Sequence, residues 1–469
     1  MNEPRAWVDP ESFASRVSVA FGGGESVPLG AYACAEGVHY LFLDGRHGYA
    51  ISCRLDATRR TPAFSGVFPM VAWDEREMQD EWGVHVEHLP DDRPLRWRDG
   101  VMPSAVVANG VGVMHMVVGP VHAGIIEPGR FTISSGGETI VHLDTQLSYS
   151  HRGVERLLER MEALDAARLV ARICGGCSAA RSFAYARALE ELAKVEIDVR
   201  TDLARLIVAE LERVYNHLGD LAASAAGAGW GPGFARGMAL KERVMRLCQL
   251  ATGHRLLFDA IVPGGVSETT LRDPQQLGAG LRAVEVDVEA YLERLFANTS
   301  LISRWRHTGI VAYETAHALG AVGPAHRAAG GKLDVRTFAP YGAYRSGPTR
   351  VAHDTSGDAF ARCRVKREEI AASFQLLHAA LVQLGAAPPP PAQAVMLVAG
   401  TAIGVVEGPR GAETVAVHLD GRGRIERVHV ISASYRNWPL VAQAIDGNIV
   451  PDFPLVNKSF NLCYACVDR

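Results

Sequence analysis

An excess of basic charge, a disulfide-rich composition and uninterrupted apolar segments are all missing from this sequence of 469 residues. Its 48 Lys and Arg are outnumbered by 52 Asp and Glu, which gives a net charge of −4. A protein that neutralises nucleic-acid phosphates needs a basic excess, so the charge balance excludes an electrostatic nucleic-acid binder. Eight Cys are too few for a disulfide scaffold at this length.

Signals for secretion and for crossing a membrane are also lacking. The sequence starts Met1-Asn2-Glu3-Pro4-Arg5, without a basic segment followed by an apolar one, so we expect no signal peptide. The most apolar run, residues 106–126, is as long as a spanning helix but contains four Gly and a Pro. We expect buried strands and a turn there, and no membrane span. The expected compartment is the cytoplasm, where paired cysteines more often bind metal.

What is present indicates a globular protein of two or three domains, with 48% hydrophobic and 21% charged residues. Apolar runs at 38–43 and 49–55 flank an Asp-Gly turn and predict two paired strands. Proline and Asp-Gly between residues 90 and 103 predict a linker. We therefore predict an N-terminal domain over 1–98, a linker over 99–112 and a large domain over 113–469.

The large domain shows helical periodicity in its centre and strand patterns on either side. Short apolar runs broken by Gly and Pro at 111–142 and 395–431 predict antiparallel strands. Between them, apolar stripes at helical spacing predict long antiparallel helices. Those segments are 152–164, 179–195, 199–226, 241–258, 273–304 and 365–384. The fold class is thus α+β, with a small N-terminal α+β domain before a central bundle of long helices flanked by antiparallel β segments.

Two Cys-x-x-Cys pairs, Cys174 with Cys177 and Cys463 with Cys466, carry the strongest chemical signal. Two such pairs can form a tetrathiolate metal site. In a zinc ribbon the pairs lie about 15–20 residues apart, whereas here the whole helical region separates them. This spacing favours one shared metal centre at the heart of the domain; two unrelated pairs or a redox dithiol are the alternatives. The isolated cysteines are expected to be small core residues: Cys34, Cys53, Cys248 and Cys363.

The two cysteine segments resemble a known family. Residues 171–177 (ARICGGC) and 461–469 (NLCYACVDR) are similar to the two cysteine motifs of nickel–iron hydrogenase large subunits. The resemblance is to the complex-I-related, membrane-bound type, such as formate hydrogenlyase large subunits, and covers residues 65–469. Residues 75–84 are similar to the signature of the complex I 30 kDa subunit. Further matching motifs are GPVHAG at 119–124, SHRGVE at 150–155, ELERVYNHL at 210–218, TGHR at 252–255 and EGPRG at 407–411.

The resemblance implies a nickel–iron centre whose iron carries CO and CN ligands. It implies that Cys174, Cys177, Cys463 and Cys466 bind nickel, with Cys177 and Cys466 bridging to iron. It also implies a Mg or Fe ion near the end of the sequence. Soft thiolate ligands suit nickel.

Several other side chains acquire roles from the resemblance. Glu155 would pass protons to and from a nickel thiolate; the alternative is a solvated helix carboxylate. Arg410 would place its guanidinium over the metals. Four more residues would surround the centre: His122, Arg181, Ser434 and Asn461. Two of these depart from the family pattern, because Arg181 stands where His is usual and Asn461 where Asp is usual.

The same fold in complex I reduces quinone, which gives a second function class. Its quinone site uses a Tyr where this sequence has Gly175, and a second His where it has Ile126. These differences favour metal over quinone, while a metal-free scaffold subunit is the third alternative. No iron–sulfur cluster is expected in this chain. Electrons would leave through a small iron–sulfur subunit, similar to the complex I 20 kDa subunit, with ferredoxin-like and membrane subunits. The complex would lie at the inner face of the cell membrane.

Overall fold

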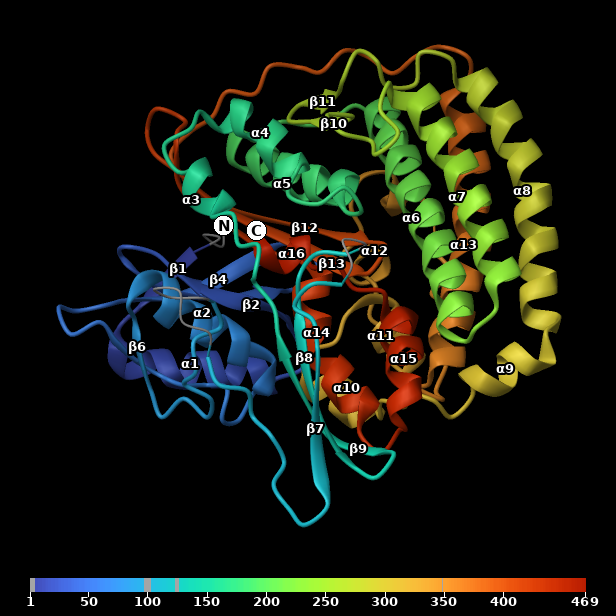
Figure 1. Cartoon of the computed structure of the whole chain (residues 1–469). Helices are drawn as coiled ribbons and strands as arrows, with labels where there is room; N and C mark the ends of the chain where they lie inside the picture. The colour runs from blue at the N-terminus through green and yellow to red at the C-terminus, as the bar shows by residue number, and fades with distance from the viewer. Residues whose placement is uncertain (1–4, 97–102, 123–125, 348) are drawn as a thin grey trace.

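The computed structural model of the protein describes residues 5–96, 103–122, 126–347 and 349–469. Within them, an N-terminal α/β unit, a β region and a group of long helices follow one another across the molecule (Figure 1). This arrangement confirms the predicted α+β class with a helical bundle beside antiparallel strands. Residues 99–102 of the predicted linker lie outside the described residues, and the domain boundaries stay a prediction.

The N-terminal unit is a four-stranded sheet with helices packed on it. Its strand order is β1-β4-β3-β2, with β1 parallel to β4 and the other pairs antiparallel. The strand pair predicted around the Asp-Gly turn is present as β3 and β4. The elements are β1 (Arg5–Val8), α1 (Pro10–Gly22), β2 (Val27–Ala33), β3 (Gly37–Leu43), β4 (Gly48–Arg54), β5 (Arg60–Pro62), α2 (Ala72–Trp82) and β6 (His85–Glu87).

The long helices run side by side, and α6 packs against both α7 and α13, as α8 does (Figure 1). Predicted helices 179–195, 199–226 and 365–384 are present, whereas the helix predicted over 241–258 begins earlier and ends earlier. Pro232 suits the first turn of α7, and Gly253, with φ 85°, ends it. The helices are α5 (Ser178–Ala193), α6 (Val199–Gly227), α7 (Gly231–Thr252), α8 (Pro274–Ala297), α9 (Thr299–Trp305) and α13 (Ala359–Leu384). Shorter elements beside them are β10 (Ile261–Val262), β11 (Gly265–Val266), α10 (Tyr313–Ala318), α11 (Gly323–Ala328) and α12 (Val335–Phe338).

The single helix predicted over 152–164 is wrong. The structure has α3 (Val154–Leu158) and α4 (Ala163–Ala171) instead. Arg160 between them has φ 71°, and its N–H donates to the carbonyl of Ile425, while the Ile425 N–H donates to Met161. Backbone pairing with a neighbouring strand therefore interrupts the helix.

The predicted strands at the end of the large domain form the sheet β12 (Gly400–Gly408), β13 (Gly411–Leu419) and β14 (Ile425–Ile431). It is buried on both faces, because α5 packs on one side and the N-terminal unit touches β12 and β14. Gly404 permits the close approach of α5, since a Cβ there would lie 1.8 Å from the Ala184 carbonyl oxygen. The chain then runs through α14 (Ala433–Ile445), α15 (Phe453–Phe460) and α16 (Ala465–Asp468).

The described part of the apolar run at 106–126 forms one strand where buried strands were predicted, and that strand is exposed. It is β7 (Val113–Val118), the edge strand of a sheet with β8 (Arg130–Gly136) and β9 (Thr139–Gln146). Met114 is 63% exposed and Val117 49%, so apolar side chains on both faces of β7 meet solvent in this chain. Among the described residues, no helix has the length and apolar character that crossing a membrane requires.

Candidate metal centre

The four paired cysteines meet in one buried cluster. The sulfurs of Cys174 and Cys463 are 3.0 Å apart, and those of Cys177 and Cys466 are 3.9 Å apart. The sulfurs of Cys174, Cys177 and Cys466 all lie within 4.8 Å of one another. Each of these contacts joins a cysteine of the first Cys-x-x-Cys pair to a cysteine of the second. A metal bound here would therefore link two segments that are distant in the sequence.

The first cysteine segment, residues 171–177, is held by polar side chains of α6. The carboxylate of Glu212 accepts hydrogen bonds of 2.7 and 2.9 Å from two N–H groups in the first turn of α5. Tyr215 and Asn216 donate to the carbonyls of the two glycines between the cysteines, at 3.1 and 2.8 Å. The loop and the helix that follows it are therefore fixed by one rigid neighbour.

Glu212 and Asn216, which hold this segment, were not predicted as site residues, and neither was Asp220, which lies beside the second cysteine segment. Glu212, Asn216 and Asp220 are spaced four residues apart, so they share one face of α6. All three are buried, in a helix whose other buried positions are largely apolar. A polar stripe at helical spacing is a signal that the sequence contains, and it marks the face turned toward the cysteines.

The second cysteine segment, residues 461–469, is held by side chains from several separate elements. The Cys463 N–H donates to the hydroxyl of Ser434 at 3.0 Å. Arg152 donates from its backbone N–H to the Asp468 carbonyl and from its guanidinium to the Ala465 carbonyl, both at 3.0 Å. Ser434, expected to face the metal ligands, thus also orients the backbone that carries Cys463.

Arg410 lies beside the cluster, with its guanidinium held on three sides. It donates to the carbonyl of Asn461 at 2.7 Å, to Oδ1 of Asn216 at 2.9 Å and to Oδ1 of Asp220 at 3.2 Å. A Cβ on Gly176 would lie 3.7 Å from both Arg410 Nη1 and the Cys174 sulfur, so the guanidinium and this thiol lie on the same side of the loop. Burial alone would lower the pKa of Arg410, but Asp220 and the thiols raise it above its usual value.

Asp220 joins this arginine to other parts of the site. Lys366 Nζ lies 2.9 Å from its Oδ2, and Asn461 donates to its Oδ1 at 2.6 Å. Burial would raise the pKa of Asp220, but Lys366 and Arg410 outweigh it and lower the pKa to about 2. Asn461, which replaces the usual Asp, therefore acts as a donor to an ionised carboxylate.

Arg181 is a second buried cation beside the sulfurs. Its Nη2 donates to the Cys466 sulfur at 3.3 Å and to Glu413 Oε2 at 2.9 Å. Two cations at the cluster favour thiolates, the form that binds metal. Hydrogen bonds among the thiols lower the pKa of Cys174 well below its usual value and raise those of Cys177 and Cys463, so without metal the cluster shares protons. Four sulfurs in this setting fit a soft metal ion such as nickel.

Two predicted site residues do not contact the sulfurs. Glu155 is 4% exposed, so the alternative of a solvated carboxylate does not hold. Its oxygens accept from Val430 N at 2.9 Å and Arg469 Nε at 2.7 Å, and no cysteine is among its hydrogen-bond partners in the described part of the chain. Burial would raise the pKa of Glu155, but the charges of His429, Arg427 and Arg469 hold it well below its usual value. His122 is hydrogen-bonded within its own loop, 2.7 Å from the Gly129 carbonyl.

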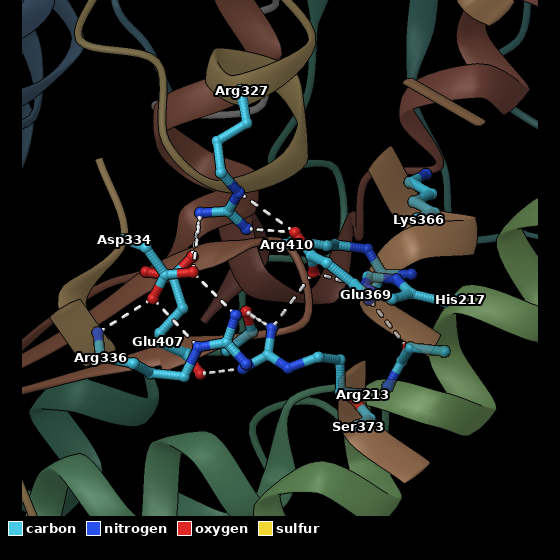
Figure 2. Close-up of polar contacts among 12 residues, drawn as sticks. Arg213, His217, Arg327, Asp334, Arg336, Lys366, Glu369, Ser373, Glu407 and Arg410 are labelled. Atoms are coloured by element: carbon cyan, nitrogen blue, oxygen red, sulfur yellow. Dashed lines mark hydrogen bonds and ion pairs between the residues drawn. The ribbon is translucent and has the colours of Figure 1, made fainter. Parts of the chain in front are cut away.

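A network of buried ion pairs surrounds a neighbouring face of α6 (Figure 2). Glu210, Arg213 and His217 lie on this face. His217 Nε2 is 2.8 Å from Glu369 Oε2, and Arg327 lies 2.6 Å from Glu369 and 2.8 Å from Glu407. Every carboxylate named here has an arginine within ion-pair distance, so the network fixes α6 against α11, α13 and β12.

Three family descriptions match the chain in separate parts. Respiratory-chain NADH dehydrogenase, 49 Kd subunit, matches residues 229–394 and 391–469, which include the second cysteine segment. Nickel-dependent hydrogenase matches residues 152–219, which include the first. Respiratory-chain NADH dehydrogenase, 30 Kd subunit, matches residues 32–104 of the N-terminal part.

Individual relatives cover most of the chain. Formate hydrogenlyase subunit 5 of Escherichia coli is 28% identical over 97% of this chain and 84% of its own length. Membrane-bound hydrogenase subunit alpha of Pyrococcus furiosus is 31% identical, over 75% of this chain and 86% of its own length. An NADH-quinone oxidoreductase subunit of Thermosipho melanesiensis is 29% identical, over 76% of this chain and all of its own length.

A solved structure shows the same fold. A chain in the structure of the membrane-bound sulfane sulfur reductase, an archaeal respiratory membrane complex, matches with a TM-score of 0.71 and 25% identity. The match covers 76% of this chain and 99% of that one. This chain therefore belongs to the family of complex I 49 kDa subunits and membrane-bound hydrogenase large subunits, with a 30 kDa-subunit-like part fused before it.

Proposed function

We propose that this chain is the catalytic large subunit of a membrane-associated nickel–iron hydrogenase complex of the formate hydrogenlyase type. It would reduce protons or oxidise hydrogen. The observation that carries the proposal is the cluster of four sulfurs flanked by the buried cations Arg181 and Arg410. A quinone site needs no thiolates, whereas a soft metal needs all four.

Each residue of the cluster has a part in the proposal. Cys174, Cys177, Cys463 and Cys466 would hold nickel, with Cys177 and Cys466 shared with iron. When bound, this centre supplies the redox-active metals at which hydrogen is formed or split. Arg410 keeps a fixed positive charge over the sulfurs, because Asp220 and Asn216 hold its guanidinium.

Glu155 is the proposed proton carrier. A cavity of about 130 Å³ adjoins it, lined also by Glu81 and His151, and has room for water. The neighbouring charges hold the pKa of this carboxylate well below its usual value, so it is ionised, and a proton that it accepts from the centre is passed on readily. Water in this cavity would connect Glu155 with the outside of the chain.

Quinone reduction is the alternative supported by relatives named as NADH-quinone oxidoreductase subunits. In the structure, the position of the quinone-site Tyr is Gly175, whose carbonyl accepts a hydrogen bond from Tyr215. The position of the second His is Ile126, which is packed against the hydrophobic core. A metal-free scaffold subunit is the other alternative.

Elemental analysis of the purified complex for nickel, iron and zinc tests the proposal. We expect one nickel per large subunit, iron in excess of nickel because the iron–sulfur subunits also contain iron, and infrared bands from CO and CN bound to iron. Zinc alone, or quinone reduction by a complex without nickel, would contradict it.

The chain is also proposed to act within a membrane-attached assembly. The cysteines outside the cluster are buried and isolated from one another. The described residues therefore contain no second group of thiolates through which electrons could leave. A small iron–sulfur subunit would receive them, together with ferredoxin-like and membrane subunits at the inner face of the membrane. The exposed apolar strand β7 offers a surface for such a subunit. A monomer in gel filtration that evolves hydrogen with a soluble dye, unaided, would contradict this.

A further inference from the structure

A buried ion cluster joins the N-terminal unit to the second cysteine segment. Arg469 donates from Nη2 to Oε1 of Glu77 on α2 at 2.5 Å, and from Nε to Oε1 of Glu155 on α3 at 2.7 Å. The side chains of all three are at most 6% exposed. We call these three residues the clasp.

The clasp lies where the resemblance implies a Mg or Fe ion. Ligand atoms of Glu77, Glu155 and His429 lie within 4.8 Å of one another, a grouping that could hold a cation. However, Oε2 of Glu155 already lies 2.9 Å from Arg427 and 3.1 Å from His429, and its Oε1 is bound by Arg469 and by Val430 N. Mg²⁺ prefers six oxygen ligands, whereas Glu77 Oε2 is the one carboxylate oxygen of these two described residues without a partner. The residues present do not fit such an ion.

We infer that the Arg469 guanidinium serves in place of this ion, and that Glu77 is a positioning residue for Cys463 and Cys466. Two buried carboxylates need a positive charge between them, because burial penalises each ion and they repel each other. Arg469 supplies this charge from three residues beyond Cys466. A side chain of the N-terminal unit thereby holds the segment that carries half of the sulfur cluster.

The clasp adds to anchors that come from the large domain alone. Arg152 and His151 contact the backbone of Asp468, but neither restrains the Arg469 side chain. Glu77 is itself fixed by Arg96, at 3.1 Å, so it is a rigid partner. Loss of Glu77 should loosen residues 461–469 while the first cysteine segment, held by α6, keeps its protection.

Amide hydrogen exchange of the metal-free full chain tests this inference separately from the proposed function. The variants are Glu77→Gln, Arg469→Met and Arg469→Lys. The matched control is Glu87→Gln, which removes an exposed partner of Arg60 in the same unit. We expect Glu77→Gln and Arg469→Met to speed exchange in residues 461–469 by roughly tenfold or more. Exchange in residues 171–177 should stay as in the wild type.

Two further readouts separate positioning from general stability. The binding of nickel(II) alone can be followed by thiolate-to-nickel absorption. We expect weaker binding to Glu77→Gln and to Arg469→Met, and partial recovery in Arg469→Lys. Added Mg²⁺ should restore nothing. If Glu77→Gln loosens β3 and β4 as much as residues 461–469, Arg469→Met decides, since it removes the same contact and changes no residue of the N-terminal unit. Unaltered exchange in Arg469→Met, or its rescue by Mg²⁺, would overturn the inference.

Discussion

The two cysteine segments bring equal numbers of sulfurs to the cluster but are held in different ways. The first is fixed chiefly by neighbouring side chains of one helix, α6, and by its own continuation into α5, with further contacts from Arg152 to the Ile173 carbonyl and from Asp259 to Arg172. The second is fixed by contacts from α2, α3, α14, the 150–153 loop and Arg410, which are scattered over the chain. The first half of the site is thus formed by the bundle, whereas the second half requires the assembled molecule.

This difference indicates which of the two cysteine segments opens more easily. Opening residues 171–177 would disturb the packing of α5 on α6, which belongs to the core. Opening residues 461–469 would break hydrogen bonds, ion pairs and a short helix, α16, and would expose Leu462, Tyr464 and Val467, but it would leave the long helices packed. We expect metal insertion to precede closure of the second segment.

Cys466→Ser should abolish nickel retention without unfolding the helices. The sulfur is lost from the second segment, while the bundle that holds the first segment is packed elsewhere. Nickel content and circular dichroism measure the two effects. The control is Cys248→Ser, a buried cysteine of α7 outside the cluster, which should keep nickel at a stability cost of about 1–3 kcal/mol. Full nickel and activity in Cys466→Ser would contradict the tetrathiolate assignment.

Glu155→Gln should slow hydrogen–deuterium exchange at the centre by about 10²–10⁴-fold, because it removes a positioned proton carrier. The CO and CN infrared bands should persist if nickel and iron remain bound. The structure adds a second possibility, since Gln also weakens the contact with Arg469. If nickel is lost while exchange per nickel is unchanged, Glu155 belongs to the clasp and not to the proton path.

The two segments should respond to pH in opposite directions in the metal-free chain. Burial raises the pKa of Glu212, beside the first segment, from 4.5 to about 8. Its contribution to the free energy of unfolding is on the order of 4 kcal/mol. This contribution is complete below pH 4.5 and is lost as pH rises toward 8. Asp220, beside the second, has a pKa of about 2 because Lys366 and Arg410 outweigh burial. Its contribution to the free energy of unfolding is on the order of 2 kcal/mol. This contribution is complete above pH 4 and is lost as pH falls toward 2.

Local amide exchange, corrected for the intrinsic effect of pH, measures both slopes. Glu212→Gln should flatten the alkaline slope of the first segment and leave the acid slope of the second. Asp220→Asn should do the reverse. Equal slopes in both segments would show that the two halves of the site open together.

Ser434→Ala should weaken nickel binding about tenfold, because it leaves the buried Cys463 N–H without a partner at a cost of about 1–2 kcal/mol. The control is Ser373→Ala, which removes a buried hydrogen bond to Glu210 on the neighbouring face of α6. It should lower thermal stability and leave nickel affinity unchanged. Similar nickel affinities for the two variants would remove Ser434 from the set that holds the second segment.

Much of the fold could be predicted from the sequence because its signals are local. Helical periodicity placed α6 and α13 to within a few residues at most ends, and the Asp-Gly turn placed β3 and β4. The burial of β7 could not be predicted, since an apolar strand looks the same whether the surface that covers it belongs to its own chain or to a partner. The helix expected over 152–164 failed because the backbone of a distant strand, β14, competes for its hydrogen bonds.

The sequence by itself determined the chemistry of the site: four thiols in two pairs, the arginines beside them, and the motifs that place them in a family. Only the tertiary structure decided how these residues meet. It paired the sulfurs across the two segments, placed Asp220 under Arg410, and set Arg469 between Glu77 and Glu155. The reason is physical: periodicity and capping act over a few residues, whereas the pairing of buried charges depends on which distant elements pack together.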